Sequence, residues 1–254
     1  MHVPNAPEIT RAFGLGEPLG ELVLVRRGDT DTWRLETTGG THFVKGYWAE
    51  TGGQFVAGGL DDQLRVAMAF EARALAAGVD MAEPVAPVDP VVGWATRIGD
   101  RLFRVHRWIE SRGLEPGDDI GEWLGRTMAQ VHQLRPVGAA GLPDIDWDSV
   151  RVDSAAREAG RVAYIFGSGE LEPMQRILSA YVEAGGDVAW IGSALFTSVA
   201  RNQLQIVREH VLVSLGLNPP ARWMSDPEQT LTDLLTELPG KLTRLRQLSA
   251  ELVG

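Results

Sequence analysis

The stretch that ends at Lys45 constrains the fold of this 254-residue chain most strongly. Residues 22–25 and 32–36 are rich in the aliphatic, aromatic and β-branched side chains that favour strands. Glycine-containing turns separate these runs from each other and from a third run, residues 41–45. The order predicts a three-stranded antiparallel meander whose last strand places one cation at its end.

The segments after the meander predict two lobes. Residues 61–77 carry apolar side chains at helical spacing, with Glu71 in the middle and Gly78 as a stop signal. Two further strands, 93–98 and 101–109, are joined by a hairpin turn. Residues 1–20, broken by glycines, predict a loosely structured lead-in. All later segments are helical in character, so we expect lobes at residues 1–109 and 110–254.

Composition excludes several classes of function. The net charge of −10 argues against nucleic acid or an anionic membrane as a partner. The chain has no cysteine, so thiol nucleophiles, disulfides and cysteine-bound metals are excluded. No apolar run is long enough to span a bilayer, and no signal peptide is visible. These features predict a cytoplasmic protein.

With both lobes in view, the chain resembles the aminoglycoside phosphotransferase family, the small-molecule branch of the kinase fold. The likeness is carried by residues 33–37, 43–45, 70–75, 104–110, 124–132, 145–149 and 180–186. It implies an α+β, protein-kinase-like fold in two lobes. The amino-terminal lobe would be a five-stranded antiparallel sheet with one helix. The carboxy-terminal lobe would be helical and lack the catalytic-loop sub-domain.

The resemblance also implies a nucleotide site. Lys45 would contact the phosphates of ATP, and Glu71 would hold that lysine in place. The backbone of three consecutive residues would form hydrogen bonds with adenine: His106, Arg107 and Trp108. Asp146, the first residue of an Asp-Trp-Asp motif, would bind Mg²⁺, which prefers carboxylate oxygens.

The catalytic loop of the family is missing from the sequence. That loop contains His-x-Asp followed by an asparagine, and its aspartate accepts the proton of the substrate hydroxyl. Residues 136–143 stand in its place and contain no base. No histidine of the chain has an aspartate two places on: His2, His42, His106, His132 and His210. Asp144 or Asp148 could supply a substitute base.

Three hypotheses follow. The first is a degenerate phosphotransferase, a pseudokinase that holds a small molecule, a nucleotide or a partner protein in the cleft between the lobes. The second is an active ATP- and Mg²⁺-dependent O-phosphotransferase of the antibiotic type, with Asp144 or Asp148 as base. The third is an interaction protein, a homo- or hetero-oligomer, that exposes Trp190, Phe196 and Trp223 to a partner. Core packing is the competing interpretation of these three aromatics.

Overall fold

The computed structural model describes much of the chain in two compact units. One unit holds residues 1–113 and 147–150, and the other holds 114–146 and 151–254. The described residues are 4–27, 30–47, 59–110, 112–113, 115, 118–134, 145–146, 149–150, 155–186, 188, 192, 194–221 and 224–253. An antiparallel amino-terminal sheet and a helical carboxy-terminal part confirm the predicted α+β class. The lobe boundary at residue 109 stays a prediction.

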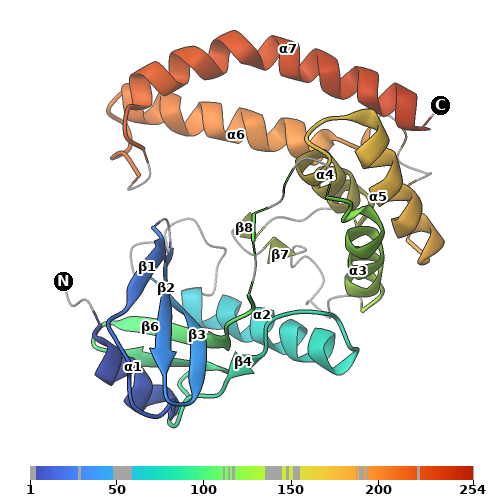
Figure 1. Cartoon of the computed structure of the whole chain (residues 1–254). Helices are drawn as coiled ribbons and strands as arrows, with labels where there is room; N and C mark the ends of the chain where they lie inside the picture. Colours follow the sequence, from blue (N-terminus) through green and yellow to red (C-terminus); the bar gives the residue numbers. More distant parts are fainter. Residues whose placement is uncertain are drawn as a thin grey trace. The chain divides into compact units, whose positions relative to one another are not determined.

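The first unit is built on an antiparallel sheet (Figure 1). Its elements are α1 (Ala6–Phe13), β1 (Val23–Arg26), β2 (Thr30–Thr37), β3 (Gly40–Tyr47), α2 (Gly59–Ala76), β4 (Pro84–Val85), β5 (Ala95–Ile98) and β6 (Arg101–Arg107). The strand order is β1-β2-β3-β6-β4, and β5 pairs with β6. Within the described residues the sheet therefore has six strands. The predicted number of five is wrong because Pro84 and Val85 pair with His106 and Val105.

The two helices of this unit pack on opposite faces of the sheet. Side chains alternate along a strand, so Val44 and Phe103 point to one face while their neighbours point to the other. Helix α1 covers the first face, where Ile9 and Phe13 share a buried core with Val44 and Phe103. Helix α2 covers the second face, where Leu64, Met68, Tyr47 and Leu102 form a separate cluster. We call these the α1 face and the α2 face.

Helix α1 corrects the expectation of a loose lead-in. Asn5 and Glu8 form a reciprocal capping box, with Oδ1 of Asn5 accepting from the amide of Glu8 at 3.0 Å. Oε2 of Glu8 accepts from the amide of Asn5 at 2.9 Å. Gly14 ends the helix in the left-handed region, at φ 62°. The glycines that broke the pattern in the sequence are thus a helix stop and the turn that follows it.

The second unit is helical. Its helices are α3 (Gly121–Gln133), α4 (Ala155–Phe166), α5 (Leu171–Glu183), α6 (Thr197–Ser214) and α7 (Pro227–Val253). The two-residue strand β7 (Ile145–Asp146) also belongs to this unit, whereas the two-residue strand β8 (Ser149–Val150) belongs to the first unit. Helix α7 contains Pro239 within its bounds. The core includes Met174, Ile177 and Leu248, all buried.

A close helix crossing in this core gives a testable prediction. A Cβ atom at Gly125 of α3 would lie 2.4 Å from the carbonyl oxygen of Ile177 and 2.7 Å from the amide nitrogen of Tyr181. These are backbone atoms of α5, so the helices themselves would have to move apart. We expect Gly125→Ala to lower the free energy of unfolding by about 1–3 kcal/mol.

The matched control is Gly240 in α7, where a new Cβ meets nothing within 4 Å. Gly240→Ala should raise the free energy of unfolding by about 0.5–1 kcal/mol, because alanine is the better helix former. Urea titrations of both variants measure the difference. Equal effects of the two substitutions would contradict the tight crossing of α3 and α5.

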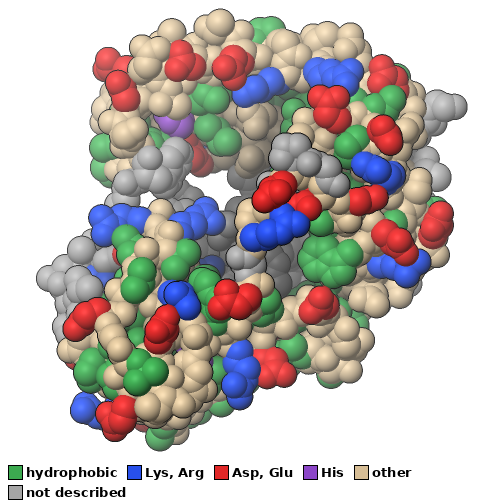
Figure 2. All heavy atoms as spheres, viewed as in Figure 1, with side chains coloured by type: hydrophobic (Ala, Val, Ile, Leu, Met, Phe, Trp, Pro, Cys, Tyr) green, Lys and Arg blue, Asp and Glu red, His purple; other side chains and the backbone are tan. Residues whose placement is uncertain are grey.

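The surface carries both signs of charge. On the face that Figure 2 shows, acidic and basic side chains occur together on both units. No helix among the described residues is long and apolar enough to cross a membrane.

Candidate functional site

The predicted lysine lies where the sequence placed it, on β3. Its cross-strand partner in the β3–β6 ladder is Arg104, so both side chains point to the α2 face. The ammonium of Lys45 lies 5.5 Å from the centre of the Tyr47 ring, within range of a cation–π contact. Two cations therefore stand side by side beneath α2, and Lys45 is the more exposed of the two.

The carboxylate of Glu71 binds the other cation. This side chain is 2% exposed and forms an ion pair with the guanidinium of Arg104, which is 5% exposed. Its second oxygen lies 2.9 Å from Nε2 of His106. Because a carboxylate only accepts hydrogen bonds, Nε2 of His106 is the donor in this contact, and its 3.2 Å approach to Nη2 of Arg104 is then not a hydrogen bond. Glu71, Arg104 and His106 form one buried network, which we call the Glu71 cluster.

The expected pairing of Lys45 with Glu71 is not formed. Among the residues that the structure describes, no ion pair within 4 Å joins the two. Arg104 lies directly across the ladder from Lys45, so both cations are near Glu71. Arg104 is the more deeply buried of the two, and it binds the carboxylate. Sequence reasoning missed Arg104 as a partner. Its spacing of two from His106 was the available signal, since it places both on one face of a strand.

The expected adenine-binding backbone is partly used by the sheet. The amide of Arg107 donates to the carbonyl of Glu83 at 2.8 Å, and the amide of Trp108 donates to the carbonyl of Thr41 at 3.0 Å. Two of the predicted donors are therefore occupied. In the described part of the chain, the first amides beyond them that donate no hydrogen bond are those of Ile109 and Glu110.

An aromatic group lies on the same face as the Glu71 cluster. The Trp108 ring packs against Phe43 with centroids 6.4 Å apart, and the guanidinium of Arg34 lies 5.4 Å from the Trp108 ring centre. Phe43 also contacts the ring of His106, with centroids 6.5 Å apart. Nε1 of Trp108 and Nε of Arg34 are buried donors without a hydrogen-bond partner in the described structure. Trp108 thus packs against an aromatic ring and a guanidinium of the same sheet face.

The side chain of Arg107 lies on the other face. It is directly opposite His42 in the ladder, and β-strand alternation puts both on the α1 face. It forms an exposed ion pair with Glu83 at 3.2 Å. The structure therefore brings Glu71, His106 and Trp108 to one face and separates the Arg107 side chain from them.

The predicted acidic residues fall at the limit of what is described. Asp146 lies on β7, where the backbone alone is described, while Asp144 and Asp148 lie outside the described residues. The shortened segment 136–143 lies outside them too. Within the described residues, no group of three metal-ligating side chains is gathered. The Mg²⁺ role of Asp146 stays a prediction.

One of the three aromatics of the interaction hypothesis is resolved. Phe196 is 3% exposed and belongs to the core of the second unit, which confirms core packing for this residue. Trp190 and Trp223 lie outside the described residues. Phe196 therefore cannot form part of an exposed apolar patch.

Comparisons with known proteins place the fold. No family model matches the chain, and no curated protein matches it. Solved structures do match the chain. Spectinomycin phosphotransferase in complex with ADP and spectinomycin has a TM-score of 0.41 at 10% identity, covering 87% of this chain and 60% of that one. This chain thus spans less than two thirds of that protein. A microcompartment-associated aminopropanol kinase has a TM-score of 0.48 at 14% identity, covering 92% and 94%.

A third solved structure shows the fold of the chain. The aminoglycoside phosphotransferase of Alicyclobacillus acidocaldarius has a TM-score of 0.54 at 10% identity, and the match covers 99% of this chain and 96% of that one. The likeness extends over nearly the whole of both chains. The chain has the kinase-like fold of an aminoglycoside phosphotransferase.

Proposed function

We propose that this chain is a degenerate member of the small-molecule kinases, a pseudokinase that binds a ligand or a partner and does not transfer phosphate. The observation that carries the proposal is the Glu71 cluster, in which the carboxylate expected beside Lys45 is held by Arg104 and His106. The absence of any His-x-Asp in the sequence supports it independently.

The Glu71 cluster bears on catalysis because kinases need their lysine–glutamate pair in place to position the phosphates. Moving Glu71 to Lys45 would leave the guanidinium of Arg104 buried without a counter-ion. Breaking a buried pair in this way costs about 3–5 kcal/mol. This cost keeps the carboxylate of Glu71 away from Lys45. The ammonium of Lys45 can therefore attract an anion, but the Glu71 carboxylate does not hold it in one orientation.

The composition of the chain gives a clean test of phosphoryl transfer. Lys45 and Lys241 are its two lysines, and Lys241 forms an exposed ion pair with Glu237 in α7. Radiolabelled ATP with Mg²⁺ and a panel of hydroxyl and amino compounds should give no turnover above background. Turnover that disappears in Lys45→Ala and persists in Lys241→Ala would contradict the proposal.

The same pair of lysines separates nucleotide binding from catalysis. A nucleotide acyl phosphate acylates a lysine that lies beside bound phosphates, and mass spectrometry then compares Lys45 with Lys241. ATP that protects Lys45 alone would identify a nucleotide-binding pseudokinase. Equal labelling of both lysines, unchanged by ATP, would narrow the function to binding of another small molecule or of a partner protein.

The active enzyme remains the second candidate, because the fold is that of a phosphotransferase. It requires a base, and Asp144 and Asp148 are the candidates that the sequence offers. Under this hypothesis Asp144→Asn or Asp148→Asn abolishes turnover while ATP still raises the melting temperature. Turnover that these substitutions abolish is not expected of a pseudokinase, whereas a rise in melting temperature with ATP is also expected of a pseudokinase that binds nucleotide.

A further inference from the structure

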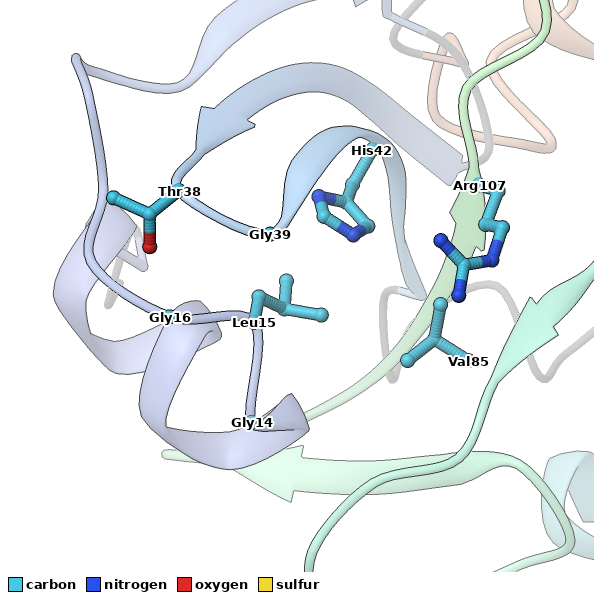
Figure 3. Close-up of a pocket in the computed structure, with 8 residues that line it drawn as sticks. All are labelled: Gly14, Leu15, Gly16, Thr38, Gly39, His42, Val85 and Arg107. Atoms are coloured by element: carbon cyan, nitrogen blue, oxygen red, sulfur yellow. The ribbon is translucent and has the colours of Figure 1, made fainter.

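We propose that a cavity on the α1 face of the sheet is a binding site for a small organic carboxylate with a compact apolar body. The cavity has a volume of about 260 Å³ and lies within the first unit (Figure 3). It is lined by Gly14, Leu15, Gly16, Thr38, Gly39, His42, Val85 and Arg107. Because it lies on the face opposite the Glu71 cluster, it does not depend on the proposed function.

The positive pole of the cavity is a cross-strand pair. Arg107 of β6 and His42 of β3 are directly opposite in the ladder. Nε of Arg107 is engaged by Glu83, and Figure 3 shows the guanidinium beside Val85 at the rim of the cavity, on the side of His42. The terminal nitrogens form the planar fork that matches a carboxylate.

The ring of His42 is buried beside the cavity. Its side chain is 3% exposed, and Nδ1 is inaccessible to solvent and makes no hydrogen bond in the described structure. Figure 3 shows the ring pointing into the space between Leu15 and Arg107. Burial, with the charge of Arg107, lowers the pKa of His42, and the carbonyl of Gly40 offsets part of that effect. A neutral imidazole adds no second positive charge to the cavity.

The wall opposite the strand pair is backbone. A Cβ at Gly16 would lie 2.3 Å from Oγ1 of Thr38, and one at Gly39 would lie 2.6 Å from the carbonyl of Leu15. Glycine is therefore required for the two segments to meet. Gly16 has φ 83°, and its amide donates no hydrogen bond among the described residues. This amide is a second donor beside the cavity.

These groups select the charge and the body of the ligand. The lining contains one guanidinium and no lysine, which favours a ligand with one negative charge over a doubly charged phosphate. Leu15 and Val85 supply apolar contact, which an inorganic anion cannot use. The volume of about 260 Å³ limits the ligand to a small molecule. A monocarboxylate with a short aliphatic or aromatic body meets all three conditions.

Benzoate is a suitable probe, titrated into the full chain and followed by amide NMR. We expect the amide resonances of Gly16, Gly39 and His42 to shift together, with a dissociation constant of about 1 mM or below. Arg107→Gln should weaken binding about tenfold or more, because a charge-assisted hydrogen bond is lost. The substitution is on an exposed side chain, so the fold should survive it.

Two more variants sharpen the result. Glu83→Gln removes the competing carboxylate and should strengthen benzoate binding by about two- to fivefold. Arg97→Gln, which removes an exposed arginine paired with Asp61, should leave it unchanged. An unshifted spectrum at about 10 mM benzoate would overturn the proposal. So would undiminished binding in Arg107→Gln, or inorganic phosphate binding as tightly as benzoate.

Discussion

Replacement of Glu71 by leucine should lower the free energy of unfolding by about 3–5 kcal/mol. The loss arises because the guanidinium of Arg104, 5% exposed, would remain buried without its counter-ion. Nε2 of His106 would lose its acceptor in the same step. Urea unfolding of the variant and of the natural chain measures the difference.

The double variant Glu71→Leu with Arg104→Met tests the cause. Removing both charges replaces the pair by apolar side chains of similar volume, so most of the loss should be recovered. About 1 kcal/mol should remain, since the hydrogen bond to His106 is still missing. A double variant as unstable as Glu71→Leu alone would mean that the carboxylate acts through packing and not through its pairing with Arg104.

The two facing cations of the β3–β6 ladder, Arg104 and Lys45, provide matched control variants. Arg104→Met should be strongly destabilising because it leaves the carboxylate of Glu71, 2% exposed, without its ion pair. Lys45→Met, directly across the strand pair, should change the free energy of unfolding by less than about 1 kcal/mol, since it removes a cation–π contact with Tyr47 and no ion pair found within the described residues. The reverse order of the two effects would show that Glu71 pairs with Lys45 in solution.

The sequence predicted strands of the sheet because the residue patterns that define them are local in the sequence. Alternating apolar runs around Lys45 and the helical spacing around Glu71 define β2, β3 and α2 without knowledge of the rest. Strand β4 was missed because two residues beginning with Pro84 carry no periodicity of their own. Helix α1 was missed although Asn5 and Glu8 form a recognisable capping box, because the glycines that follow dominated the interpretation.

The site was harder to predict because its partners are chosen by burial. The sequence shows that Glu71, Arg104 and His106 exist, and period two puts the last pair on one face. It does not show which of two neighbouring cations, Lys45 or Arg104, lies deeper beneath α2, and that depth decides which one binds the carboxylate. The family resemblance favoured Lys45, whereas Arg104 holds the carboxylate in the structure.

The cavity on the α1 face could not be predicted from the sequence either. His42 and Arg107 are separated by 64 intervening residues in sequence, and only the β3–β6 register makes them neighbours. Arg107 entered the prediction through its backbone, as part of an adenine site. Its side chain instead points to the opposite face, which the strand alternation relative to His106 would have indicated.

Acid should destabilise the chain through His132, a residue of α3. Burial lowers the pKa of His132 from 6.5 to about 4, and Nδ1 lies 2.9 Å from the hydroxyl of Tyr181 on α5. The unfolded chain binds this proton near pH 6.5 and the native chain only near pH 4, so unfolding takes up a proton between those values. The contribution is complete above pH 6.5 and is lost as the pH falls, by about 3 kcal/mol in total.

Carboxylates also titrate in this range, so the variant His132→Gln is needed to isolate the effect. Glutamine has no titrating group and can still hydrogen-bond to Tyr181. The difference in free energy of unfolding between the natural chain and this variant should shift by about 2 kcal/mol between pH 6.5 and pH 5, against the natural chain. Because α3 and α5 meet closely at Gly125, a protonated imidazole there cannot be relieved by a small separation of the helices. Parallel pH profiles of the two proteins would show that His132 titrates normally in the native state.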